Sequence, residues 1–302
     1  MIVPISIVST DGYSTLRKVC QNSKSGYYFS NFGVRPSKLF DGVDKRLTIF
    51  IKNNEPIEKC FITKYFRWVS EERDNLFSYF SYQNVRQDYF TISGYPKISS
   101  KIEQAILDRL KKQSKSLSHF IVRTSSHKIR YTRKLQYFIQ FFEKPPIIYD
   151  AKRHVIEPTE LKDITVGSEI EKNTLISVLN SNLFFWFFIT FSDCRNVNSR
   201  EILKFPIDLT KMNDDLKKQL TKFAKSLMKD LDKNSVFLHR NDKRAGLLEI
   251  QSFQPRASKL IIDEIDTLLA KHYGFTDEEL DFIINYDIKY RMGKELESEE
   301  EV

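Results

Sequence analysis

The sequence predicts an α/β protein, α+β overall, and three observations point to it. Residues 1–52 read as strand, helix, strand and strand, residues 57–210 mix helical and extended patterns, and residues 211–302 are mainly helical by their apolar periodicity. A chain of 302 residues exceeds what one hydrophobic core usually organises. We therefore expect domains at 1–56, 57–210 and 211–302.

The first segment predicts the closing part of an open sheet. Ile2–Val8 is a continuous apolar run, as in a buried strand. Tyr13–Val19 is expected to form a short helix with Leu16 and Val19 inward. A sheet of so few strands cannot bury both of its faces, so we expect it to need strands that this chain does not supply.

Two aromatic and β-branched stretches, Tyr27–Phe32 and Leu47–Ile51, have the composition of buried sheet strands. In the loop between them, proline fixes one backbone angle and glycine permits a tight turn. A cationic loop with an aromatic tip suits a phosphate together with a flat ring, which predicts a base-binding site. The residues concerned are Arg35, Pro36, Lys38, Phe40 and Gly42.

The middle of the chain predicts one clear helix and several short strands. Ile98–Lys112 has apolar residues four apart, with lysine and arginine on the opposite side, as an amphipathic helix has. Cys60–Val69 is expected to be a strand and Glu71–Phe80 a helix. Further extended segments are expected at Phe120–Thr124, Lys128–Tyr131 and Gln136–Phe142.

The net charge of the chain is concentrated in one region. Twelve basic and three acidic residues lie between Arg86 and Lys134, a net charge of +9, against +8 for the whole chain. Basic side chains that contact phosphates release condensed counterions, so this region favours a polyanionic partner, although a solvated helix face explains it equally well. In residues 131–146 aromatics alternate with basic and amide groups, which suits base stacking or a half-buried strand.

Helices are expected in the C-terminal part of the chain. Thr174–Phe191 is strongly apolar and predicts a buried helix or helical hairpin. Asp214–Leu231 and Ala257–Tyr273 predict two more helices. A capping box, Thr276 with Glu279, predicts the start of another.

The sequence argues against disulfides, a metal site and a membrane-spanning segment. The three cysteines are isolated and the five histidines show no metal-ligand spacing, so we predict reduced thiols and no metal site. The longest apolar run, Leu183–Phe191, is far shorter than the roughly 20 residues of a membrane-spanning helix, and the N-terminus lacks the basic residues of a signal peptide. The chain is therefore expected to be cytoplasmic, with no membrane partner.

The chain resembles the C-terminal half of adenine-specific DNA methyltransferases of restriction-modification and related phage-defence systems. Five segments carry the resemblance, in the expected order: IVPISIVST (2–10), FGVRPSKLFDGVDKRLTIFI (32–51), YTRKLQYFIQFFEKPP (131–146), LNSNLFFWFFITFSDCRNVNSREILKFPI (179–207) and SKLIIDEIDTLLAKHYGFTDEELDFIINYDIKYRMG (258–293). The resemblance implies an incomplete Rossmann-like methyltransferase sheet end, a mixed α/β target-recognition domain and a C-terminal helical segment.

The catalytic motifs of that family are absent from this sequence. In the family, S-adenosylmethionine lies on a glycine-rich strand–turn, and an Asn/Asp-Pro-Pro-aromatic motif holds the adenine amine. Here the only Pro-Pro pair, Pro145-Pro146, follows Lys144 and precedes Ile147. The resemblance therefore implies a catalytic half and an S-adenosylmethionine site upstream of Met1, and no catalytic residue in this chain. Whether the chain acts as an enzyme stays open.

Candidate binding residues follow from the resemblance and from the charge pattern. Phe40 matches the position of an aromatic that packs on the adenine after the base has left the duplex, although the residues alone favour a core position equally. Arg35 and Lys38 would lie near the phosphates of the flipped nucleotide. The other DNA-binding candidates are Lys128, Arg130, Arg133, Lys134 and Arg195.

Together these features predict the DNA-binding, target-recognition portion of a site-specific adenine DNA methyltransferase that uses S-adenosylmethionine within a restriction-modification system. We expect double-stranded DNA and an N-terminal catalytic half as partners, and no methyl transfer by this chain alone. The alternative is a stand-alone DNA-specificity subunit that docks on a separate catalytic subunit. An RNA-binding protein is a weaker third interpretation.

Overall fold

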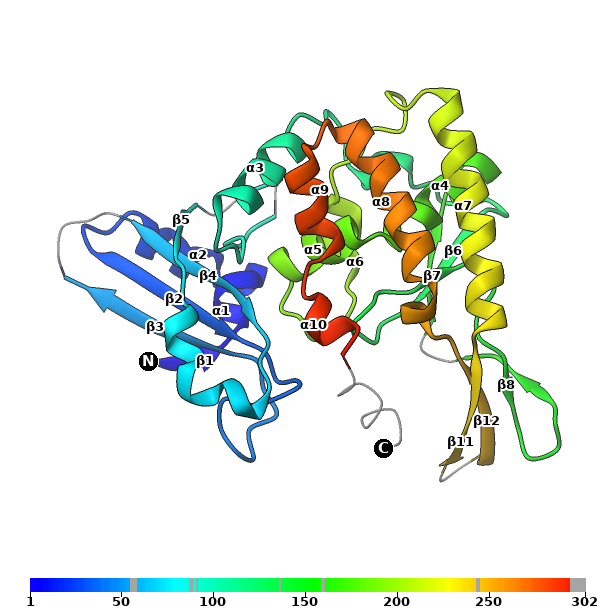
Figure 1. Cartoon of the computed structure of the whole chain (residues 1–302), viewed down its shortest axis with the longest axis horizontal. Coiled ribbons are helices and arrows are strands. Elements are labelled where there is room, and N and C mark those ends of the chain that lie inside the picture. Colours follow the sequence, from blue (N-terminus) through cyan, green and yellow to red (C-terminus); the bar gives the residue numbers. More distant parts are fainter. Residues whose placement is uncertain are drawn as a thin grey trace. The chain divides into compact units, whose positions relative to one another are not determined.

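The structure is a computed structural model (Figure 1). It divides by internal contacts into two units. The first unit comprises Met1–Ser118, Trp186–Ile207 and Tyr273–Val302, and the second comprises His119–Phe185 and Asp208–His272. Residues 57–210 and 211–302, each expected to form a domain, contribute to both units. The structure describes residues 1–54, 59–86, 89–90, 92–135, 137–158, 161–242 and 245–293.

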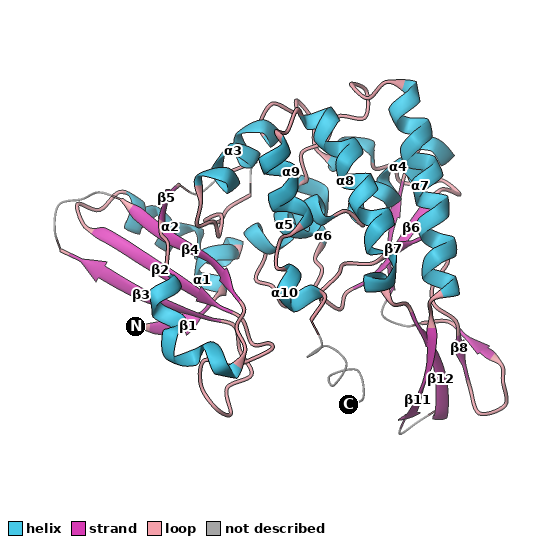
Figure 2. Cartoon of the chain, viewed as in Figure 1, coloured by secondary structure: helices cyan, strands magenta, loops and turns pink. Residues whose placement is uncertain are grey.

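The first unit contains a five-stranded mixed sheet (Figure 2). Its order is β1-β3-β2-β4-β5, and β3 runs antiparallel to both β1 and β2. Because β2 and β4 are parallel, β1, β2 and β4 all point the same way and end at the same edge. The strands are β1 (Ile2–Pro4), β2 (Gly26–Phe32), β3 (Leu47–Asn53), β4 (Cys60–Phe66) and β5 (Gln83–Val85).

The predictions of β2 and β3 are confirmed, whereas two expectations about the first segment are wrong. The strand expected over Ile2–Val8 ends at Pro4, and α1 (Ser6–Ser9) follows. Helix α2 (Ser14–Gln21) exists, but Leu16 and Val19 are exposed and Arg17 is buried instead.

Arg17 explains both differences. Its guanidinium donates hydrogen bonds to the carbonyl oxygens of Ile7 and Thr10, at 2.8 and 2.9 Å, and to Ser93. A fully buried guanidinium requires partners for its N–H groups, and backbone carbonyls of a turning chain supply them. These bonds hold the turning segment after Pro4 against α2, which buries Arg17 and Cys20.

An aromatic and aliphatic cluster packs at the end of β2 and β4. It consists of Phe32, Leu39, Leu47, Phe66, Trp68 and Leu76. Leu76 belongs to a 3-10 helix over Ser70–Tyr79, in place of the helix expected at Glu71–Phe80. Within this segment Leu76 is buried, Phe80 is partly buried against the cluster and Phe77 is exposed. The cluster fixes the base of the β2–β3 loop, because Leu39 from that loop is part of it.

Helices α3 (Lys101–Leu110) and α9 (Asp277–Ile284) pack together in the first unit. Arg109 Nε lies 2.6 Å from Glu279 Oε2. Glu279 also completes the predicted capping box with Thr276, which is confirmed. The remaining described helices of this unit are α6 (Ser199–Lys204), α10 (Ile288–Arg291) and the second half of α5 (Asn182–Phe191).

Two antiparallel sheets lie in the second unit. One has the order β10-β6-β7 and the other β11-β12-β8-β9. The strand expected at Lys128–Tyr131 is confirmed as β6, but only Phe141 and Phe142 of Gln136–Phe142 are paired, and Gln136 lies outside the described residues. The strands are β6 (Lys128–Thr132), β7 (Phe141–Phe142), β8 (Ile148–Tyr149), β9 (Val155–Ile156), β10 (Leu161–Thr165), β11 (Val236–Asp242) and β12 (Gly246–Ser252).

The strongly apolar segment predicted to be helical forms two helices. Helix α4 (Glu169–Leu179) is followed by α5, with a bend of 68° between them. At the break, the Asn180 side chain bonds both backbone groups of Phe141, at 3.1 and 2.8 Å. The Asp266 carboxylate accepts hydrogen bonds from the backbone N–H of Asn182 and Leu183, so it caps the start of α5.

No single helix within the described ranges has the length and apolar character to cross a membrane. Only the bent pair of α4 and α5 passes such a criterion jointly, and its apolar side chains are largely buried in the protein. Helices α7 (Asp214–Lys233) and α8 (Lys259–Tyr273) complete the second unit, close to their predicted bounds. Gly274 ends α8 with a φ of +71°.

A buried ion pair supports the end of β4. The guanidinium of Arg67 contacts the carboxylate of Asp287, and both side chains are less than a tenth exposed. We expect Arg67→Met to lower the free energy of unfolding by about 3–5 kcal/mol, because it leaves the Asp287 charge buried without its partner. Urea unfolding measures this loss.

A surface ion pair provides the control for that substitution. Lys111 Nζ lies 3.4 Å from Asp108 Oδ1, and both side chains are exposed. Lys111→Met should change the free energy of unfolding by less than about 1 kcal/mol. If both substitutions lowered the free energy of unfolding equally, burial would not explain the contribution of the Arg67–Asp287 pair to stability.

Candidate nucleic-acid interface

The carboxyl ends of β1, β2 and β4 lie at one edge of the first unit's sheet. In open α/β sheets this edge is where ligands bind, since the loops that leave parallel strands gather there. Three segments leave the strands at this edge: residues 5–11 after β1, residues 33–46 after β2 and residues 67–69 after β4.

Residues 33–46 form a loop that presents Phe40. Arg73 donates hydrogen bonds to the carbonyl oxygens of Lys38 and Leu39, at 3.2 and 3.0 Å. Leu39 is 8% exposed in the aromatic cluster, whereas Phe40 is 40% exposed. Phe40 is therefore not a core residue, and its backbone is held on one side by a buried neighbour.

The turn after Phe40 is tight. The backbone N–H of Val43 donates to the carbonyl of Phe40 at 3.2 Å, and Gly42 has a φ of +74°. That left-handed conformation suits glycine, because it lacks a Cβ. The peptide bond between Arg35 and Pro36 is cis.

Both cations predicted on the loop lie near Asp44, because Lys38 and Arg35 each help to lower the pKa of its carboxyl. Lys38 forms an ion pair with Asp44, and the hydrogen bond from Lys38 is the main reason that the pKa of Asp44 is lowered. Part of the Lys38 charge is thus balanced locally. Arg35 is exposed to solvent on the same loop.

The stem of the loop is tied to the end of β4. Gly33 N–H donates to the Phe66 carbonyl at 2.7 Å, and Ser37 N–H donates to the Trp68 carbonyl at 3.1 Å. A Cβ on Gly33 would lie 3.0 Å from the Phe66 carbonyl oxygen and 3.1 Å from the Tyr65 hydroxyl. The close approach of β2 and β4 at this edge therefore favours glycine at position 33, because a Cβ would force its neighbours to shift.

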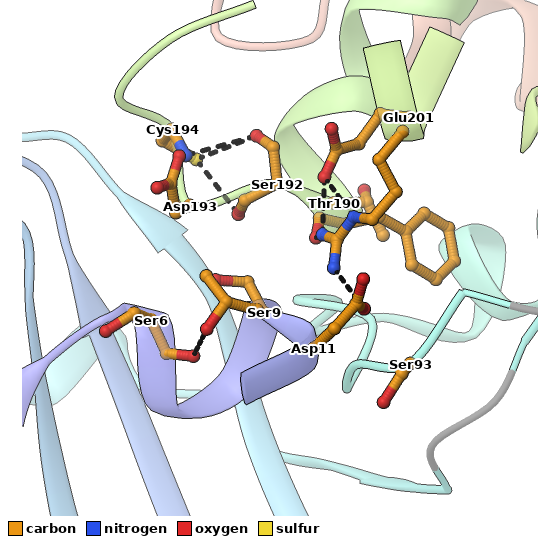
Figure 3. A network of polar contacts seen from close by, with 12 residues as sticks. Ser6, Ser9, Asp11, Ser93, Thr190, Ser192, Asp193, Cys194 and Glu201 are labelled. Carbon is orange, nitrogen blue, oxygen red and sulfur yellow. Dashed lines mark hydrogen bonds and ion pairs between the residues drawn. The ribbon is translucent and has the colours of Figure 1, made fainter. Parts of the chain in front are cut away.

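A polar network joins the segment after β1 to the first turn of α6, which follows the connection between α5 and α6 (Figure 3). Arg200 Nε donates to Glu201 Oε1 at 2.9 Å, and Arg200 Nη1 donates to Asp11 Oδ1 at 2.8 Å. Glu201 is 1% exposed, and its burial raises the pKa of the carboxyl. An open hollow of about 250 Å³ lies here, lined by Thr10, Asp11, Asp193, Asn198, Arg200 and Glu201.

Lys97 holds the start of this connection in place. Its ammonium donates hydrogen bonds to the carbonyls of Thr190 and Ser192, at 2.9 and 2.6 Å. The side chain is 1% exposed, and this burial lowers the pKa of Lys97. The last carbonyl oxygens of a helix have no intrahelical N–H group to bond. The two bonds from Lys97 supply donors to carbonyls at the C-terminal end of α5.

Cys194 and Arg195 follow in the same connection. Cys194 has a φ of +57°, and its backbone N–H donates to Ser192 Oγ at 3.1 Å. Burial raises the pKa of the Cys194 thiol, so it is held as a neutral thiol and not as a nucleophilic thiolate. Arg195 is exposed at the next position, as a phosphate-contacting residue needs to be.

The structure places the predicted DNA-binding residues in both units. Lys128 and Arg130 lie on the outer face of β6, 3.6 and 3.8 Å from Asp163 of β10, so an acid balances part of their charge. Arg133 and Lys134 are exposed just beyond β6. The first unit holds the other candidates, Arg35, Lys38, Phe40 and Arg195.

The polar network was not predicted from the sequence. Its signal is the dense polar run Asp193–Glu201, which has the composition of a turn as well as of a site. Arg200 and Glu201 are adjacent, but Asp11 is 189 positions away from Arg200. Sequence spacing alone could not predict that these side chains are hydrogen-bonded.

Two glycines near the first unit's sheet are closely packed by the chain itself. At Gly33, which follows β2, the space that a side chain would take is filled by Phe66 and Tyr65, and at Gly94, beside the segment after β1, it is filled by Val8 and Ser9. Neither of these two glycines leaves room for a cofactor to approach the backbone. A second open hollow, of about 470 Å³, lies on α7 and α8 in the second unit and is lined by Lys211, Asn213, Asp215, Leu216, Gln219, Leu268, Lys271 and His272, without a glycine.

Among the residues that the structure describes, no three His, Cys, Asp or Glu side chains come together as metal ligands. No protein-family model matches the chain, and no curated protein matches it.

The close approach at Gly33 gives a test of this edge. Gly33→Ala should lower the free energy of unfolding by about 1–3 kcal/mol, because the new Cβ meets a backbone oxygen that cannot move without breaking the β2–β4 pairing. Gly12→Ala is the matched control, since nothing lies within 4 Å of its Cβ position. Urea unfolding that shows the same loss for both variants would contradict this description of the edge.

Proposed function

We propose that the chain is the DNA-binding, target-recognition portion of an adenine-specific DNA methyltransferase of a restriction-modification system. In this role it binds duplex DNA and supplies one wall of the pocket for the extruded adenine. The observation that carries the proposal is Phe40, an exposed ring on an anchored loop at the carboxyl edge of the sheet, with Arg35 on the same loop.

The physical role of Phe40 is to stack on the base. Extruding a base from the duplex costs a few kcal/mol. Stacking on an aromatic side chain contributes about 1–3 kcal/mol, which offsets part of this cost. The Arg73 hydrogen bonds and the buried Leu39 fix the loop before DNA arrives, so little ordering is needed when the base stacks.

In this proposal the exposed cations bind the DNA phosphates. Arg35 and Arg195 are exposed in the first unit, and Arg133 and Lys134 are exposed in the second. Lys38, Lys128 and Arg130 are paired with acidic side chains, so DNA phosphates would have to displace those side chains to bind them. Binding should therefore weaken with salt, because each phosphate contact releases a counterion.

The catalytic half is the proposed protein partner. In this account the mixed sheet is the closing part of a Rossmann-like methyltransferase sheet, and β1 is an edge strand among the described residues. Apolar side chains are exposed on β1 and α2 and at the residues just before them: Met1, Ile2, Tyr13, Leu16 and Val19. An edge strand flanked by exposed apolar residues suits a further strand and its covering helix.

S-adenosylmethionine supplies the methyl group in this reaction and would be held by the catalytic half. In this account the part of the present chain is to bind DNA, orient the base and cover one face of it. Purified chain should incorporate no labelled methyl group into genomic DNA, and adding the catalytic half should restore transfer. Robust methylation by the chain alone would contradict the proposal.

Phe40→Ala tests the stacking role. With the catalytic half present, we expect methylation to fall by about tenfold or more while duplex affinity changes less than about threefold, because the ring acts only on the extruded base. Methyl incorporation and fluorescence anisotropy measure the two quantities.

Phe237→Ala is the matched control, since Phe237 is 41% exposed and lies on β11 of the second unit. Its substitution should leave the ratio of methylation to duplex binding unchanged. Equal losses of methylation and binding in Phe40→Ala would show that Phe40 serves general DNA affinity instead.

A further inference from the structure

Helix α7 of the second unit buries one side and exposes the other (Figure 1). Its inner side consists of Leu220, Ala224, Leu227 and Leu231, each at most 2% exposed. Helix α4 packs against α7, and Ser177 Oγ of α4 donates a hydrogen bond to the Leu220 carbonyl at 2.7 Å. These contacts fix the rotation of α7 about its own axis, so the side that faces solvent is fixed as well.

Four lysines line the outer side of α7. They repeat the spacing of the four buried residues, and each lysine precedes one of those residues by two positions. Two positions correspond to a rotation of about 200° at 3.6 residues per turn, so the lysines lie on the side almost directly opposite the core. All four are exposed, and together they form what we call the lysine stripe: Lys218, Lys222, Lys225 and Lys229.

The charge of the lysine stripe is not balanced on α7. Residues 216–229 include no aspartate or glutamate, and among the described residues none of the four lysines forms an ion pair with an acidic side chain. The pKa of Glu169 on α4 is lowered mainly by Lys172, and Lys225 contributes less. Like charges three or four positions apart on a helix repel one another, so the lysine stripe weakens α7 in the free protein.

The acids of α7 lie at the two ends of the helix. Two of them are in its first turn. The other two are hydrogen-bonded within the protein, because Asp230 accepts from Ser258 Oγ at 2.7 Å and Asp232 accepts from Gln251 Nε2 at 2.9 Å. Six lysines and four aspartates give α7 a net charge of only +2. The net charge of the segment therefore hides a surface on which the positive charges are separated from the negative ones.

We propose that the lysine stripe binds the phosphate backbone of duplex DNA. Lys218 and Lys229 are about 17 Å apart along the helix axis at 1.5 Å per residue, and a duplex of that length carries about ten phosphate charges. The inference rests on the proposed function for the identity of the partner, and it adds a contact surface to the candidates on and beyond β6. Lysine suits this role, because its ammonium binds phosphate as a point charge and phosphate contacts carry no sequence information.

The composition of α7 favours DNA over an anionic membrane. A helix that lies on a membrane buries apolar side chains among the lipids in addition to placing its cations near the headgroups. The apolar side of α7 is buried in the protein, and none of the large hydrophobic side chains described on α7 is exposed. The outer side of the helix therefore offers charge without an apolar surface, which suits a hydrophilic polyanion.

Replacing all four residues of the lysine stripe by glutamine in the full chain tests the inference. The slope of log K against log salt for duplex DNA should fall in magnitude by about 3–4, since each lost phosphate contact removes about 0.9. At 100 mM salt, duplex binding should weaken by about thirtyfold or more, equally for two duplexes of unrelated sequence. The thermal midpoint should not fall, because the side chains are exposed and their mutual repulsion is removed. Fluorescence anisotropy and calorimetry measure these quantities.

Two control variants make the test specific. Replacing the same four residues by arginine keeps their charge and should keep the slope. Replacing four exposed lysines of the first unit by glutamine removes the same charge elsewhere and should change the slope by less than about 1. These control residues are Lys18, Lys24, Lys52 and Lys59.

Three results overturn the inference. One is an unchanged slope in the glutamine variant of the lysine stripe, and another is an equal loss of slope in the first-unit control, which would show that net charge alone determines DNA binding. The third is binding of the wild-type chain to phosphatidylserine vesicles that the glutamine variant loses while its DNA slope is unchanged, which would assign the lysine stripe to a membrane.

Duplex binding and assisted methylation, measured in parallel, separate this inference from the proposed function. If the chain binds duplex DNA and supports methylation, but the glutamine variant keeps the full slope, the role of the lysine stripe alone is overturned. If the glutamine variant loses slope, but the chain supports no methylation with the catalytic half present, the proposed function is overturned and the DNA-binding surface on α7 is supported. A chain that binds no duplex DNA overturns both.

Discussion

The backbone pairing of β2 is the constraint on which the candidate site depends. β2 hydrogen-bonds antiparallel to β3 on one side and parallel to β4 on the other, and β3 in turn pairs with β1. This arrangement brings the carboxyl ends of three strands to one edge. The loop of residues 33–46, the segment after β1 and the end of β4 lie at the same edge for that reason, and Gly33 permits the close approach of the strands there.

Buried cations fix the irregular segments at this edge. Arg17 and Lys97 donate almost entirely to backbone carbonyls, and Arg67 pairs with Asp287. Each cation satisfies carbonyls or a charge that would otherwise be buried without a partner, so these segments are held without regular secondary structure. A rigid edge suits the proposed function, because a loop already in place loses little entropy when a base stacks on it.

Local sequence patterns predicted much of the fold but less of the candidate nucleic-acid interface. Residue composition located β2 and β3, apolar periodicity located α3 and α7, and a capping signal located the box at Thr276. The hairpin of β11 and β12 was missed, since β11 is exposed along most of its length and shows no alternation of burial. The bend after Pro4 and the Asp11–Arg200 pair depend on residues far apart in the chain, which spacing cannot reveal.

Hydrogen–deuterium exchange on the full chain, with and without duplex DNA from a genomic digest, tests the central claim most directly. The account predicts slower exchange on DNA binding in peptides covering residues 33–46 and 192–201, both from the carboxyl edge of the sheet. Protection confined to other regions, such as the β11–β12 hairpin, or no protection at all, would contradict it.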